Sequence, residues 1–276
     1  AGDGFMAGGN YVAVLLGLVV GGILVELPGN MIGLAALVVA VVGLLASIMI
    51  PRSKAAHPGI EIQLNPFKGN CEMIVCALSS PVLTRSILAL SWFLLIGSTF
   101  MAQFPNYAQA IVHGSNEVYI VFLTTFSLGI ALGSVLCDTL LKGDVSSRLA
   151  PFSALGISLF TYGMVFFTPE VEHEGLMNAI EYLSVSAHWG VLICMLLAAV
   201  CGGMYMVPLY AIIQSRVEPS MRSRVLAASN FSGSLFITLA ALVSAYFLYA
   251  GLRVDELFIV LASLNLLMVW YARKVT

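Results

Sequence analysis

Long apolar runs separated by short polar connections make up almost the whole of this 276-residue chain. A helix that crosses a bilayer needs roughly 20 mostly apolar residues, and glycine and proline are tolerated inside such helices. The expected fold class is therefore an all-α integral membrane bundle. The pattern predicts about eight membrane-spanning helices, over Phe5–Leu24, Met31–Ile50, Leu83–Gln103, Val118–Leu141, Leu149–Phe167, Trp189–Ile213, Val225–Tyr249 and Leu257–Tyr271.

One long polar stretch, Pro51–Ser80, interrupts this pattern and divides the helices into two before it and six after it. Its prolines rule out one continuous helix, and its charged side chains need water. We therefore predict a solvated connector over residues 51–80, with the helices of residues 1–50 on one side and a six-helix bundle over residues 81–276 on the other.

Composition supports the membrane assignment, because 60% of the residues are hydrophobic and only 9% are charged, with a mean hydropathy of +0.99. Soluble domains carry about 25% charged residues, so a soluble fold would lack the polar side chains to cover its surface. The net charge of −2 also argues against a nucleic-acid partner, which would need a clustered basic face.

The distribution of cations predicts the orientation. If the connector is cytoplasmic, eleven of the twelve Lys and Arg residues fall on the cytoplasmic side, and Arg253 alone lies opposite. Cytoplasmic loops of membrane proteins carry an excess of Lys and Arg. Both ends of this chain are then expected to be cytoplasmic.

Motifs typical of enzymes are missing from the sequence. It contains no Gly-x-Ser-x-Gly elbow, no phosphate-binding glycine loop with a lysine, and no His-Glu-x-x-His. The five cysteines have neither metal-ligand spacing nor an evident pairing. We expect no catalytic residue, no bound metal and no cofactor.

The end of the fourth predicted helix and the connection that follows it contain Gly133, Asp138, Lys142 and Gly143. A glycine, a carboxylate at the helix end and a basic glycine-containing turn resemble the cytoplasmic signature of the major facilitator superfamily. In that signature the Asp follows the Gly by four residues, whereas Asp138 follows Gly133 by five. The resemblance implies a role for these residues in conformational change. The alternative is a short charged turn between two helices.

Two later stretches resemble the lysophospholipid-transporter branch of that superfamily more closely. One has a Gly-Gly pair, a Val-Pro-Leu run and a terminal Gln214; the next opens with a basic turn and continues to Asn230-Phe231. The segment from Gln103 to Tyr107 is also similar. Members of the superfamily have twelve helices, so the resemblance implies that this chain covers helices five to twelve. Residues 1–50 would then hold the last two helices of an N-terminal bundle.

Such a carrier must hold a phosphate-bearing headgroup in a polar pocket while an acyl chain lies along an apolar wall. Arg85 is the candidate phosphate ligand, and its alternative role is a side chain that reaches to the membrane surface. We expect Tyr210, Gln214 and Asn230 to line the cavity. Gln103 and Asn106 are further candidate substrate contacts near the outer end. Interhelical hydrogen bonds, worth about 0.6 kcal/mol each, are the alternative role of these polar groups.

The sequence thus predicts a membrane transporter that moves a lysophospholipid across a bacterial inner membrane by alternating access. Two alternatives stay open: a drug or small-solute exporter of the same fold, and a non-transporting membrane anchor for a fused acyltransferase. In the resembling branch a fused or associated acyltransferase re-acylates the delivered lipid, so such an enzyme is an expected partner.

Overall fold

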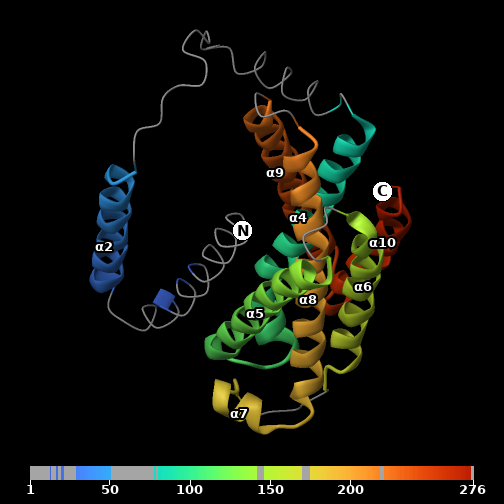
Figure 1. Cartoon of the computed structure of the whole chain (residues 1–276). Coiled ribbons are helices and arrows are strands. Elements are labelled where there is room, and N and C mark those ends of the chain that lie inside the picture. Colours follow the sequence, from blue (N-terminus) through green and yellow to red (C-terminus); the bar gives the residue numbers. More distant parts are fainter. Residues whose placement is uncertain are drawn as a thin grey trace.

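The computed structural model describes residues 29–50, 80–141, 146–169, 175–217 and 221–274, together with positions 13, 17, 20, 21 and 78. Every regular element in these ranges is a helix (Figure 1). The elements are α2 (Gly29–Ile48), α4 (Pro81–Asn106), a π-helix (Tyr107–Ile111), α5 (Asn116–Leu141), a 3-10 helix (Ser147–Leu149), α6 (Ala150–Phe166), α7 (Ala179–Ser184), α8 (His188–Ser215), α9 (Arg222–Tyr249) and α10 (Val254–Ala272).

Seven of the described helices are long and apolar enough to cross a membrane. They coincide with seven of the eight predicted spans, and the all-α membrane bundle is confirmed. The remaining predicted span, Phe5–Leu24, lies outside the described residues except for four helical positions. The connector over residues 51–80 is also outside them, apart from positions 78 and 80.

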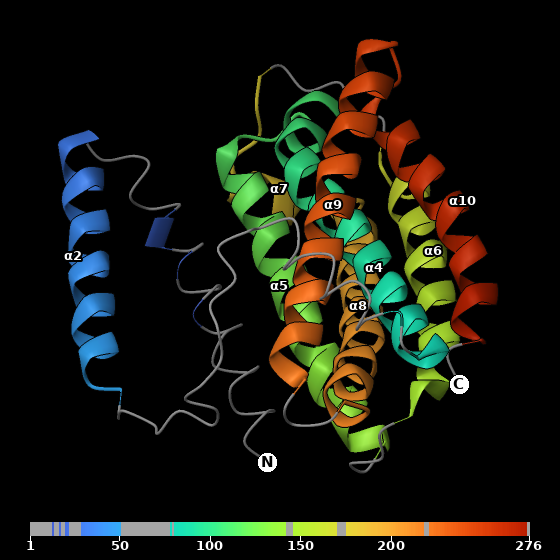
Figure 2. The ribbon, with the colours of Figure 1, turned by 90° about the horizontal axis from the view of Figure 1, so that it is seen from above.

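Helix α2 stands apart from the other helices in both views (Figures 1 and 2). From Met31 to Ile48 its side chains are apolar around the whole circumference except for Ser47, and its membrane-length window has no buried residue. A helix that is apolar on all sides is covered by lipid or by other protein. The division of the chain at residues 51–80 stays a prediction.

The other six long helices form one bundle in which α8 packs between α5 and α6, and α4 packs against both α8 and α9. Helix α10 closes the bundle between α4 and α6 (Figure 2). Its core holds a cluster of aromatic rings whose centroids lie 4.8–6.5 Å apart, in the range typical of favourable ring pairs. The cluster consists of Phe100, Phe104, Tyr107, Phe122, Phe126 and Phe258.

Helices α5 and α8 approach so closely that glycine is required where they cross. A Cβ atom on Gly133 would overlap the carbonyl oxygen of Val200, and one on Gly129 would lie 2.6 Å from the carbonyl oxygen of Leu196. On the α8 side, a Cβ atom on Gly203 would likewise lie too close to the carbonyl oxygen of Ile130. Small residues four apart allow this contact between helix backbones, so Gly129 and Gly133 form a packing face.

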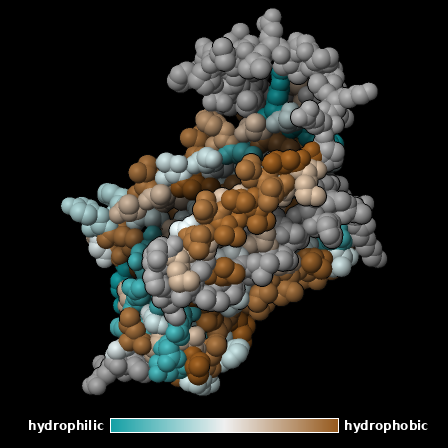
Figure 3. Space-filling view, turned by 90° about the vertical axis from the view of Figure 1, so that its left-hand side faces the viewer, coloured by the Kyte–Doolittle hydropathy of each residue, from teal (hydrophilic) through white to brown (hydrophobic). Residues whose placement is uncertain are grey.

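Charge is distributed unequally between the two ends of the bundle. Successive long helices run in opposite directions because their connections are short. Of the eight cations among the described residues, seven therefore lie at the end where α4, α6 and α9 begin, and Arg253 lies at the other. Large apolar side chains cover much of the surface between the ends (Figure 3), as expected of a surface in contact with lipid.

Candidate functional site

Arg85 lies on the second turn of α4, at the cation-rich end of the bundle. Its Nη1 donates a 2.7 Å hydrogen bond to the backbone carbonyl of Lys274, just after the end of α10. Basic side chains near a helix C-terminus stabilise its last carbonyls. The side chain is half-buried, and the contact engages one of the five N–H donors of a guanidinium. Arg85 therefore links the beginning of α4 to the end of α10, and we call this contact a clamp.

Three other predicted cavity residues lie toward the same end. Tyr210 and Gln214 occupy the last two turns of α8 and are half-buried. Asn230, on the third turn of α9, is exposed, and its backbone carbonyl accepts a hydrogen bond from Ser234. An exposed amide at membrane depth needs a polar surrounding, such as a water-filled cavity or another helix.

The remaining two predicted substrate contacts lie at the opposite end of α4. The amide of Asn106 donates a 2.8 Å hydrogen bond to the side-chain oxygen of Gln103, which is 9% exposed. At about 1.5 Å per residue, Gln103 is about 27 Å along the helix from Arg85. One headgroup cannot contact both ends at once, so the six predicted substrate contacts divide into two groups.

The predicted conformational motif is described only in part. Gly133 is buried at the crossing of α5 and α8, whereas Asp138 is exposed near the end of α5. Lys142 and Gly143 lie outside the described residues. A role of this motif in conformational change stays a prediction.

A buried polar network at membrane depth joins α4, α6 and α10, and sequence reasoning missed it. Asn265, 2% exposed, accepts a hydrogen bond from Trp92 Nε1 at 3.1 Å. Its amide nitrogen donates to the Ala154 carbonyl at 2.8 Å and to Ser158 Oγ at 3.0 Å. Ser158 in turn donates to the Ala262 carbonyl. The signal available in the sequence was an asparagine inside an apolar run, because such polar side chains form hydrogen bonds between membrane helices.

The end opposite the cations is covered by the short helix α7. Asn178 and Glu181 form a capping box at its start, a pattern that is readable from the sequence as Asn-x-x-Glu. The Glu117 carboxylate accepts a hydrogen bond from the Ala179 backbone N–H at 2.9 Å. The ring of Tyr182 stacks on that of His188 with centroids 4.2 Å apart, and both side chains are fully buried.

The Tyr182 hydroxyl is buried without a hydrogen-bond partner among the described residues. We expect Tyr182→Phe to leave the free energy of unfolding unchanged or to raise it by about 1 kcal/mol, because the variant removes an unsatisfied polar group. Tyr107→Phe is the matched control, since it removes a hydroxyl that is bonded to Thr168 and should cost about 1 kcal/mol. Thermal unfolding in detergent compares the two, and a clear loss for Tyr182→Phe would contradict the expectation.

Burial, with a smaller contribution from nearby Tyr107, raises the pKa of Tyr182 above its ordinary value. Tyr182 stays neutral in the folded protein at a pH where the same side chain ionises in the unfolded chain, near pH 10. The stability that comes from this neutral state is therefore fully present below about pH 10 and decreases as the pH rises beyond that. The Tyr182→Phe variant should lose less stability than the parent between neutral and strongly alkaline pH.

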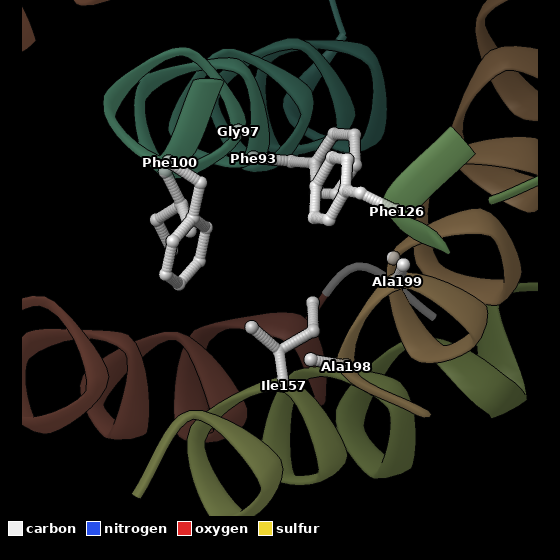
Figure 4. A pocket seen from close by; sticks show the side chains of 9 residues that line it. Phe93, Gly97, Phe100, Phe126, Ile157, Ala198 and Ala199 are labelled. Atoms are coloured by element: carbon white, nitrogen blue, oxygen red, sulfur yellow. The ribbon is translucent and has the colours of Figure 1, made fainter. Parts of the chain in front are cut away.

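An apolar hollow lies in the interior of the bundle, between α4, α5, α6 and α8 (Figure 4). The space enclosed within it is small, about 10 Å³, which is roughly what one water molecule needs. Its lining is apolar throughout and consists of Phe93, Ile96, Gly97, Phe100, Phe126, Ile157, Ala198, Ala199 and Gly202. Elsewhere among the described residues, no group of three His, Cys, Asp or Glu side chains is placed to hold a metal ion.

These features define an α-helical integral membrane protein whose bundle has one strongly basic end. A comparison with characterised proteins finds similarity to the lysophospholipid transporter LplT of Escherichia fergusonii, with 28% identity over 224 residues. The aligned region covers 79% of this chain and 51% of that protein, so the chain spans about half the length of this curated relative. No known protein-family profile matches the chain, and no solved structure matches it.

Proposed function

We propose that the protein is a transporter of the major facilitator type that moves a lysophospholipid across a bacterial inner membrane by alternating access. The observation that carries this proposal is the similarity to a lysophospholipid transporter over 79% of the chain. A six-helix bundle with an apolar surface and one basic end is consistent with it. In transporters of this kind, two bundles rock around a site near the middle of the membrane.

The substrate proposed here has two parts with different requirements. Its phosphate needs a cation, and Arg85 is proposed to supply it as a charge-assisted hydrogen-bond donor. Tyr210, Gln214 and Asn230 line the path at the same end of the bundle. The positive-inside rule predicts that this basic end faces the cytoplasm. An acyltransferase on that side, fused or associated, would re-acylate the lipid.

Substitution of Arg85 tests the proposal. Hydrogen bonds to charged groups contribute about 2 kcal/mol, so Arg85→Ala should lower the rate of lysophospholipid uptake about 30-fold. The measurement is uptake of a fluorescent lysophosphatidylethanolamine by vesicles that contain the protein. Arg148→Ala is the matched control, because Arg148 is an exposed arginine at the same end and its loss should leave uptake unchanged.

The contact with Lys274 makes a second measurement necessary. Melting temperatures of both variants show whether Arg85→Ala acts by loosening α10. If uptake falls only in proportion to the loss of folded protein, Arg85 is a clamp and not a phosphate ligand. A folded protein that takes up no lysophospholipid but exports dyes or drugs would support the exporter alternative, and one that transports neither would support the anchor.

A further inference from the structure

We propose that the junction of α4 and α10, at the basic end of the bundle, binds the phosphate of a lipid, with Arg85 and Lys274 as its cations and Tyr271 as a hydroxyl donor. This inference rests on the proposed function, which assigns the phosphate to Arg85, and it adds the α10 half of that site. The end of α10 lies beside the beginning of α4 (Figures 1 and 2), where Arg85 binds the Lys274 carbonyl. Arg85 is half-buried and Lys274 is exposed, so a lipid at the membrane surface can reach both.

Arg85 points toward α10, and not toward the predicted cavity residues on α8 and α9. Trp92 lies seven residues after Arg85, which is about two helical turns and therefore the same face of α4. Its indole donates a hydrogen bond to Asn265 of α10. The next residue, Phe93, contacts the ring of Tyr205 on α8 instead. A phosphate that is bound to Arg85 is therefore closest to groups on α10.

The contacts that hold the two cations are with neutral groups. Arg85 Nη1 donates its 2.7 Å hydrogen bond to the Lys274 carbonyl, and the Lys274 ammonium lies 3.5 Å from the centre of the Trp270 ring. The two charges are thus separated by no more than one lysine side chain and one hydrogen bond. Like charges repel each other, and a phosphate between them relieves that repulsion. Arginine binds phosphate through its fork of donors, and lysine binds it as a point charge.

Tyr271, on the last turn of α10, brings a hydroxyl group to the same junction. It is half-buried and lies close enough to Arg85 for the two side chains to interact electrostatically. Tyr and Trp side chains are enriched where a membrane meets water, which is the depth of lipid phosphates. Basic pockets between membrane helices bind phospholipid headgroups. The junction combines both features, because Trp270 and Tyr271 lie beside the two cations.

Apolar side chains extend the site toward the middle of the membrane. Leu88 follows Arg85 by three residues on α4 and is 38% exposed. Leu264 precedes Tyr271 by seven residues, on the same face of α10, and is 41% exposed. A lipid whose phosphate lies between the cations can place its acyl chain along these side chains, where the burial of methylene groups is favourable.

Lys274→Gln tests the α10 half of the site, because it removes the ammonium group and keeps the backbone carbonyl that Arg85 binds. The protein is titrated with lipid in a maltoside detergent, which has no phosphate, and bound lipid is counted by native mass spectrometry. We expect this variant to bind palmitoyl lysophosphatidylethanolamine about tenfold more weakly than the parent protein, and Tyr271→Phe to bind it about fivefold more weakly. Palmitoylglycerol, which has the same acyl chain and no phosphate, should bind equally well to all three proteins.

Arg224→Gln is the matched control. Arg224 is an exposed arginine at the same end of the bundle, at the start of α9. Its substitution removes the same charge away from the junction, so binding of the lysophospholipid should change less than about twofold, because salt screens distant surface charges. If Arg224→Gln and Lys274→Gln weaken binding equally, total charge accounts for the effect and the proposed site is wrong.

The phosphate can come from the transported lysophospholipid or from a two-chain lipid of the membrane, and a parallel titration with dioleoyl phosphatidylglycerol separates the two sources. If Lys274→Gln loses both binding and uptake of the lysophospholipid, the site belongs to the substrate. If it loses phosphatidylglycerol binding and keeps full uptake, the site holds a membrane lipid.

Two further outcomes separate this inference from the proposed function. If Lys274→Gln binds both phospholipids as tightly as the parent protein, the site is wrong, while uptake that still depends on Arg85 leaves the proposed function standing. If the unmodified protein takes up no lysophospholipid, the proposed function fails, and the two binding titrations still decide whether the junction binds a lipid phosphate.

Discussion

Gly133→Ala is expected to lower the free energy of unfolding by about 3 kcal/mol, at the upper end of the usual cost of overpacking. The added methyl group would meet the backbone carbonyl of Val200, and a backbone atom cannot rotate away as a side chain can. Helices α5 and α8 must therefore separate along their shared contact. The melting temperature in detergent should fall by roughly 6–12 °C.

The same substitution at Gly97 is the control for this prediction. It adds one methyl group to a helix of the same bundle, at a position where no other described residue lies within 4 Å of the added carbon, so the melting temperature should stay the same or rise. Helix propensity alone favours alanine by about 1 kcal/mol at both positions. If Gly133→Ala is as stable as the parent protein, α5 and α8 do not approach each other as closely as described here.

Most of the helices could be predicted from hydrophobicity because each span is an uninterrupted apolar run. Their ends could not be predicted closely, since polar residues at the membrane surface continue a helix without extending the apolar pattern. Helix α9, for example, begins at Arg222 and not at the predicted Val225. Helix α7 escaped prediction because it has only six residues and no apolar run.

Partners across the bundle were beyond sequence reasoning. Arg85 and the Lys274 carbonyl are 189 residues apart, and no local pattern links them, so the clamp on α10 is visible only in the structure. Likewise, the sequence singles out Asn230 and passes over Asn265. Both are asparagines in apolar runs, and only packing shows that Asn265 is buried among three helices while Asn230 is exposed.

That difference between the two asparagines gives the second large effect. Asn265→Ala removes three hydrogen bonds, to Trp92, Ala154 and Ser158. At about 0.6 kcal/mol for each bond between membrane helices, the free energy of unfolding should fall by about 2 kcal/mol. The melting temperature should then fall by roughly 4–8 °C.

Asn230→Ala makes the same chemical change at an exposed position on α9. Surface substitutions usually change stability by less than about 0.5 kcal/mol. The melting temperature of this variant should therefore stay within about 1 °C of the parent protein. Under the proposed function its effect should appear instead in lysophospholipid uptake, because the amide would line the substrate path. The two variants therefore separate stability from transport, with Asn265 acting on the first and Asn230 on the second. The reverse result, a stable Asn265→Ala and an unstable Asn230→Ala, would mean that α9 packs through the face that is exposed here.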